Sequence, residues 1–215
     1  LAVINSELDA AQLFTQTGTG AVPRTMLSKV KEVAVSITDF GGVEGLLVNN
    51  TAAFNLAKAS LPNGGVIEFP IGNWRGNFLI NQHNLSIRGS GGVGELDQTC
   101  LRPWTTGAST YTIKVSDGTR VNRKCGIRDL VISGDNGSGV MAASALHLSG
   151  GTVHFSALNF DLMDGEHSLH IEPSGGLPVT TSWFSQFHIR TDYSVANSRS
   201  IYIKRNVDPE YVTSI

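Results

Sequence analysis

FSALNFDL, residues 155–162, is the middle one of three strand-like segments that recur along the chain. IRDLVISG begins 28 residues before it, at Ile127, and FSQFHIRT begins 29 residues after it, at Phe184. A second apolar segment follows each of them, beginning at residues 146, 169 and 201. Strand pairs at this period, separated by turn residues and not by helices, predict a β-solenoid whose windings stack along one axis. A β-sandwich or jelly roll is the competing fold, since it also contains many short strands.

The composition is that of a turn-rich globular protein, with 40% hydrophobic residues, 16% charged residues and 24 glycines among 215 residues. The formal net charge of -2 argues against a nucleic-acid partner, which would select a basic face. No apolar run approaches the ~20 residues that span a bilayer, so no membrane insertion is expected. The two cysteines lie in no cluster with metal-ligand spacing. We therefore expect buried free thiols, with a disulfide between Cys100 and Cys125 as the alternative, and no metal or other cofactor.

Residues 1–32 differ from the rest of the chain. They contain two helix-compatible stretches, NSELDAAQLF at 5–14 and RTMLSKVKE at 24–32, separated by the flexible TQTGTGAV. This pattern predicts a helical, neck-like connector that precedes a β domain over residues 33–215.

One helix is expected inside the β domain. Asn50 can cap TAAFNLAKASL, residues 51–61, and PNGG can end it by removing a donor and supplying glycines for positive φ. Such a helix can cover the unpaired strand edge at the start of a stacked solenoid. Its apolar face would consist of Ala53, Phe54, Ala57 and Leu61.

Two longer segments carry a resemblance to a known family. VSITDFGGVEGLLVNNTAAFNLAKASLPNGGVIEFPIGNW (35–74) and NLSIRGSGG (84–92) resemble the start of the β-helix domain of bacteriophage tailspikes, a domain shared with pectate-lyase-like proteins. The preceding GTGAVPRTMLSKVKE is similar to the segment before this domain in phage tail proteins. The resemblance implies an all-β fold, a right-handed single-stranded parallel β-helix with a short N-terminal capping α-helix. The chain departs from the family pattern at Gly42, Asn49, Asn50 and Trp74.

The same resemblance implies a role at the bacterial surface. Tailspikes of this family are homotrimers in the virion tail that bind bacterial surface polysaccharide and attach to other tail or baseplate proteins through their N-terminal side. We expect the native polypeptide to continue beyond Ile215, because no capping device follows the last predicted strand. The alternative is a non-catalytic tail-fibre shaft or adhesin that positions a distal receptor-binding module. A secreted pectinase-like enzyme is a third, less favoured reading.

DLMDGEH, at 161–167, is the densest cluster of carboxylates in the chain. Hydrolases of the family use paired carboxylates as acid and base, and windings about 5 Å apart bring equivalent residues to the separations that glycosidases need. A polysaccharide depolymerase of the hydrolase type is therefore favoured over a lyase. The competing interpretation is a solvated turn. The candidate catalytic residues are Asp161, Asp164 and Glu166, and alignment of the repeats places Asp135 and Asp192 beside them as candidate binding residues.

Aromatic and basic side chains supply candidate sugar contacts. Arg88 and Arg102 can hold the carboxylates of uronic or sialic acids, although salt bridges are the alternative. His167 and His170 are interpreted as incidental surface histidines. The candidate stacking residues for sugar rings, with core packing as the alternative for each, are Trp74, Trp104 and Trp183.

Overall fold

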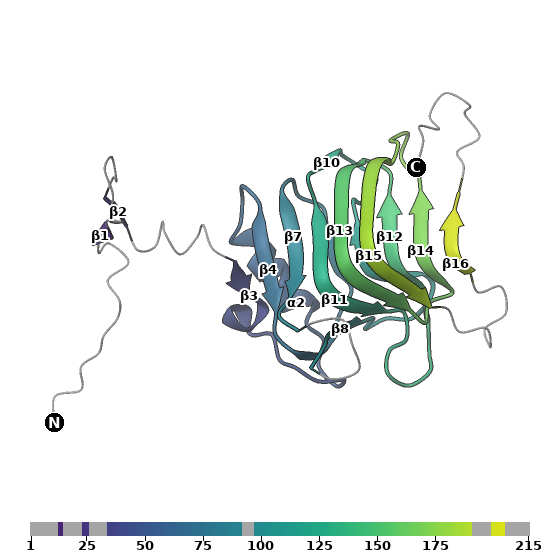
Figure 1. The fold of residues 1–215 in the computed structure, drawn as a ribbon, viewed down its shortest axis with the longest axis horizontal. Helices are drawn as coiled ribbons and strands as arrows, with labels where there is room; N and C mark the ends of the chain where they lie inside the picture. Colours follow the sequence, from purple (N-terminus) through teal and green to yellow (C-terminus); the bar gives the residue numbers. More distant parts are fainter. Residues whose placement is uncertain (1–12, 15–22, 26–33, 92–96, 191–198, 205–215) are drawn as a thin grey trace.

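The computed structural model describes residues 13–14, 23–25, 34–91, 97–190 and 199–204. The described chain is rich in β-structure, and apart from one short antiparallel pair its strands are parallel and follow one another side by side along the long axis, which they cross (Figure 1). Among these residues no helix is long and apolar enough to cross a membrane. The expected parallel stacking of strands is therefore present.

The strands form a nine-stranded and a five-stranded parallel sheet, in which three ladders can be followed from winding to winding. The first ladder contains β3 (Val35–Ser36), β4 (Gly65–Phe69), β7 (Leu85–Gly89), β10 (Asn122–Arg123) and the first halves of β11 (Gly126–Ser133), β13 (Thr152–Met163) and β15 (Thr180–Arg190). The second contains β5 (Gly72–Arg75), β8 (Thr99–Arg102) and the second halves of β11, β13 and β15. The third is the five-stranded sheet of β6 (Phe78–Ile80), β9 (Gly107–Val115), β12 (Ala142–Ser149), β14 (His167–Glu172) and β16 (Arg199–Ile203).

The core lies between the ladders and consists of stacked apolar side chains. In the first ladder, Ile67, Ile87, Ile127, Ala157 and Phe184 follow one another in register. The first four are almost fully buried, and Phe184 packs against the same core. Because side chains alternate along a strand, the residues between these positions point outward. Each ladder therefore presents an outer face to solvent.

A bend joins the first ladder to the second inside β11, β13 and β15. Asp129, Asn159 and Gln186 occupy it with φ of 57°, 51° and 51°. Asp and Asn tolerate this left-handed conformation better than most residues. Asn159 Nδ2 also donates to Asp129 Oδ1 over 2.9 Å, which ties two successive bends together. The bend sets the outer faces of the two ladders in different directions.

Helix α2 (Thr51–Ala59) forms where a helix was predicted and follows the 3-10 turn η1 (Ile37–Phe40). All four residues of its predicted apolar face are buried. The Phe54 ring packs edge-on against Phe78 of β6 and lies 6.4 Å from Phe69 of β4. The helix therefore packs on the first winding.

The predicted cap of this helix is wrong in detail. Asn50 makes no side-chain capping bond. Asn49 Oδ1 accepts from the Thr51 amide over 3.0 Å instead. Asn50 is buried and crosslinks the chain, because its amide group exchanges hydrogen bonds with Val43 and also donates to the Arg75 carbonyl.

The described residues of the predicted connector form strands. β1 (Leu13–Phe14) and β2 (Arg24–Thr25) pair antiparallel, at positions where helix-compatible stretches were expected. The remaining residues of both stretches lie outside the described part of the chain, so the boundary of the connector stays a prediction.

The register differs from the sequence alignment of the repeats. Ala157 pairs with Ile127 and with Phe184, whereas the alignment set Phe155 opposite both. Each pairing is therefore shifted by two residues. A shift of two keeps every side chain on its predicted face, because the period of a strand is two. It does change which polar residues become neighbours.

Candidate functional site

Trp183 is the most exposed tryptophan of the chain and forms one wall of an open cavity. Its exposed fraction is 56%, and its ring stacks on His154 with centroids 5.8 Å apart and planes 16° apart. The cavity has a volume of about 370 Å³ and is lined by Lys124, His154, Ser156 and Trp183. We call it the aromatic trough. It lies on the outer face of the first ladder, over β13 and β15.

The floor beside Trp183 is made of small residues. Register places Ser86, Gly126, Ser156 and Trp183 in one outward-facing column on four successive strands. Gly126 has no side chain, and a Cβ atom there would lie 2.9 Å from the Ser156 carbonyl oxygen. With strands about 4.8 Å apart, the three small residues extend the low floor by roughly 10 Å from Ser156.

The flanks of the trough carry positive charge. Lys124 is exposed, and within the described residues no carboxylate lies at ion-pairing distance from it. Arg128 borders the floor on the other side, with its Nε 4.0 Å from Asp129 and nearly half of its side chain exposed. Arg88, in the same column as Arg128, forms an ion pair with Glu68. The trough thus joins an aromatic surface and hydroxyl groups to one cation, Lys124, without a carboxylate partner among the described residues, and to two arginines that are paired with carboxylates.

The other two tryptophans are placed differently. Trp74 is 1% exposed, packs edge-on against Phe69 and donates from Nε1 to the Pro70 carbonyl over 2.8 Å. It is a core residue, and its assignment as a stacking residue is wrong. Trp104 is 36% exposed, but the Arg75 guanidinium lies 4.7 Å from the centre of its ring and occupies one face.

The predicted catalytic carboxylates lie at the end of β13 and in the turn after it. Asp161 points outward from the second ladder, and its Oδ1 lies 3.5 Å from Nδ1 of the exposed His188. Its partners in register are Val131 and His188, so no carboxylate stacks on it. Asp164 occupies the turn with φ 58°, and the backbone of the half-buried Glu166 hydrogen-bonds to Ala142 and Arg199.

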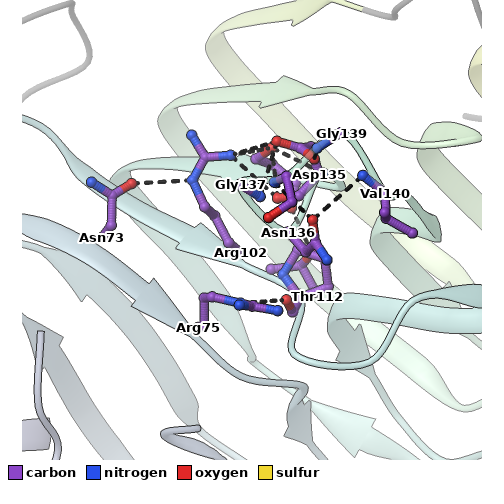
Figure 2. Close-up of polar contacts among 12 residues, drawn as sticks. Asn73, Arg75, Arg102, Thr112, Asp135, Asn136, Gly137, Gly139 and Val140 are labelled. Carbon is purple, nitrogen blue, oxygen red and sulfur yellow. Dashed lines mark hydrogen bonds and ion pairs between the residues drawn. The ribbon is translucent and has the colours of Figure 1, made fainter. Parts of the chain in front are cut away.

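Asp135 belongs to a polar network on the second ladder and the turn that follows it. Figure 2 shows Arg102 between Asn73 and Asp135, with hydrogen bonds to both. Asp135 also accepts from the amides of Gly137 and Gly139 over 3.0 and 2.7 Å. Its oxygens are therefore engaged in fixing the loop and the guanidinium. Asp192, the other predicted binding carboxylate, lies outside the described residues.

The turns that contain Asp135 and Asp164 stack on each other. Both carboxylates act on Cys100, a buried free thiol of β8. The pKa of Cys100 is raised to about 11, mainly by burial; Arg102 opposes this shift, and the two carboxylates add to it. The Gly134 amide also bonds to the Met163 carbonyl over 2.7 Å, which stacks the two turns. Of the aspartates that the repeats align, Asp135 and Asp164 therefore lie in stacked turns and Asp161 faces His188, while Asp192 lies outside the described residues.

Sequence reasoning missed most of the trough. Lys124, His154 and Ser156 come from windings before Trp183, and only the true register brings them together. One signal was available in the sequence. Trp183 and Phe184 are adjacent in a strand, so one of the two must face outward.

Comparisons with known proteins show a shared fold. No protein-family model matches the sequence, and no curated protein is significantly similar to it. The structure of ORF18 of Geobacillus virus E2 superposes with a TM-score of 0.51 and 18% identity, over 75% of this chain and 34% of that one. A Parabacteroides merdae protein provisionally assigned as a glycosyl hydrolase superposes with a TM-score of 0.47 and 13% identity, over 84% and 99% of the two chains. The chain therefore spans about a third of the viral protein, with which it shares a fold.

Proposed function

We propose that this chain is part of a bacteriophage tailspike, built on a right-handed parallel β-helix, that binds an acidic bacterial surface polysaccharide along the aromatic trough. The observation that carries the proposal is the exposed Trp183 ring, stacked on His154 at the wall of an open cavity. Exposed aromatic rings bind the apolar faces of sugars, and hydroxyls supply orienting hydrogen bonds. The parallel ladders and the fold shared with a viral protein support the placement among phage proteins.

The charges of the trough select the class of polymer. Lys124 and Arg128 flank the floor, and both remain exposed. Ammonium and guanidinium groups pair with the carboxylates of uronic and sialic acids. A capsule, O-antigen or exopolysaccharide with acidic residues would therefore bind more tightly than a neutral one.

In the complete homotrimer of the virion tail, the bound polymer would be cleaved by carboxylate acid/base chemistry. β13 carries Ser156 in the trough and Asp161 beyond the bend at Asn159, on the order of 15 Å farther along the strand. A chain lying in the trough could thus continue toward the carboxylates of 161–166. Asp161, Asp164 and Glu166 are the proposed acid and base, and residues 1–32 the proposed attachment to other tail proteins.

Binding is tested with a panel of bacterial capsular and O-antigen polysaccharides and the full 215-residue chain. We expect at least one acidic polymer to bind and Trp183→Ala to weaken that binding about tenfold or more. Trp104→Ala is the matched control and should bind as the parent does. Failure of every polymer to bind, or equal losses in the two variants, would overturn the assignment of the trough.

Cleavage is tested separately on the complete homotrimer, by the release of reducing ends from a polymer that binds. The expected result is release by the parent protein and loss of release in Asp161→Asn, Asp164→Asn or Glu166→Gln, with binding retained. Unchanged release in all three variants would exclude this cluster as the active site. Binding without any release would favour the alternative function, a shaft that attaches but does not cut.

A further inference from the structure

The outer face of the third ladder carries a column of titratable side chains that the proposed function does not use. Register stacks Lys114, His147, His170 and Tyr202 on β9, β12, β14 and β16. The rings of the two histidines are parallel within 3° and 4.3 Å apart. Glu172 lies two residues after His170 on the same face of β14. These residues lie on neighbouring strands, so that their side chains form one cluster on the outer face of the third ladder.

Two nitrogen atoms of this group make no hydrogen bond in the described structure, although one of them, Nε2 of His170, lies at ion-pair distance from Glu172. Nε2 of His147 and Nε2 of His170 are both buried, and neither makes a hydrogen bond within the described structure. Buried polar atoms without partners are rare in folded proteins, because each costs desolvation energy that nothing returns. His170 Nε2 lies 3.3 Å from Glu172 Oε2, and ligand atoms of His147, His170 and Glu172 all lie within 4.8 Å of one another.

Neighbouring groups hold these atoms ready to coordinate. Ser144 Oγ lies 3.1 Å from His170 Nδ1 and can accept a hydrogen bond from the tautomer that carries its proton on Nδ1, which leaves the lone pair on Nε2. Lys204 binds Oε1 of Glu172 over 2.5 Å, which leaves Oε2 facing the imidazole. Burial is the main cause that lowers the pKa of both His147 and His170. The positive charges of Lys114 and Lys204 disfavour the binding of a cation at this cluster, and the negative charge of Glu172 compensates for them.

We propose that His147, His170 and Glu172 bind one divalent transition-metal ion of the zinc type, which links the windings of β12 and β14. Two imidazoles and one carboxylate suit zinc, cobalt or nickel, whereas calcium and magnesium prefer oxygen ligands alone. Bonds of about 2.0–2.2 Å place tetrahedral ligand atoms about 3.3 Å apart, the separation already present between His170 and Glu172. Because the two imidazole rings are parallel, their Nε2 lone pairs do not yet converge on one point, so the side chain of His147 must both tilt out of the stack and move its Nε2 inward by on the order of 1 Å on binding. Water would take the fourth position.

The test is a titration of the full chain with Co²⁺ and Zn²⁺ after removal of metal by a chelator. We expect one ion per chain and a visible Co²⁺ spectrum with nitrogen and oxygen ligands. His147→Ala or His170→Ala should weaken binding by about a hundredfold or more, and Glu172→Gln by about tenfold. His83→Ala replaces an exposed histidine elsewhere and should change nothing.

A measurement on the parent protein covers the case in which a histidine variant fails to fold. X-ray absorption of the zinc-loaded chain should show two imidazole ligands and light-atom oxygen ligands around one ion. No binding, fewer than two imidazoles, or equal losses in His83→Ala and His147→Ala would overturn the site. Polysaccharide binding at the trough does not depend on this result.

Discussion

At the scale of single residues, the three tryptophans differ in what their rings contact. Trp74 is enclosed by the core, Trp104 has Arg75 on one face, and Trp183 leans on His154 with more than half of its surface exposed. The same residue type therefore has three roles: core packing, anchoring of a loop, and a ligand-facing wall. Substitution of Trp74 should therefore lower the stability of the fold, whereas substitution of Trp183 should weaken ligand binding.

Replacement of Trp74 by alanine should destabilise the fold by about 3–5 kcal/mol, because it empties a packed site and removes the bond to Pro70. Trp104→Ala should cost less than about 1 kcal/mol, since that ring is partly exposed. Urea unfolding of both variants provides the measurement. Similar losses in the two would contradict the contrast in packing.

The two cysteines should be unreactive in the folded protein. Burial raises the pKa of both thiols to about 11, and both are free. At pH 8 only about one thiol in a thousand is then ionised, and the thiolate is the reactive form. Ellman's reagent should detect two thiols per chain after unfolding and almost none before. Rapid reaction in the native state would show that the thiols are accessible, and none after unfolding would show a disulfide.

At the scale of elements, the start of α2 depends on an asparagine that aspartate cannot replace. Asn50 Nδ2 donates to the carbonyls of Val43, Val48 and Arg75, while its Oδ1 accepts from the Val43 amide. A carboxylate at this buried position would lose the donors and face carbonyl oxygens. Asn50→Asp should therefore cost about 2–4 kcal/mol in the free energy of unfolding.

Asn49→Asp is the matched control. Asn49 is exposed and only accepts, from the Thr51 amide, and a negative charge at a helix N-terminus is favourable by about 0.3–1 kcal/mol. Chemical unfolding should show unchanged or increased stability. If the two aspartate variants behaved alike, the role assigned to the Asn50 amide group would be wrong.

The strands that alternate apolar residues could be predicted from the sequence, as could the buried face of α2. β5 and β8 could not, because GNWR and TCLR are four residues long and each buries one large apolar side chain, Trp74 or Leu101. The pairing register of the strands could not be predicted from the alternation of apolar residues either, since a shift of two residues leaves the buried face unchanged. The trough was missed for this reason. Its residues become neighbours only when Ser156 pairs with Trp183.

At the scale of the whole molecule, the ladders turn residues distant in sequence into continuous outer faces. The first face carries the aromatic trough, the second the Arg102–Asp135 network, and the third the histidine column. Faces that extend with each added strand suit the long polymer that we propose as the ligand. The charge on the flanks should make its binding sensitive to salt.

Affinity for an acidic polysaccharide should fall as ionic strength rises from about 0.1 to about 1 M, because the Debye length shrinks from about 10 to about 3 Å. Lys124→Gln should reduce this dependence. Arg199→Gln, on the third ladder, should leave it unchanged. Affinities measured across a salt series give the slopes. If Lys124→Gln leaves the salt dependence of the affinity unchanged, this lysine does not contact the polysaccharide.

The most direct measurement is an NMR titration of the chain with an oligosaccharide from a polymer that binds, observing the three indole N–H signals. Trp183→Ala identifies the signal of Trp183. If the chain is a tailspike segment that binds sugar in the trough, we expect a saturable shift of that signal, while the signal of the buried Trp74 stays in place. Saturable binding that leaves the Trp183 signal unchanged would contradict the account.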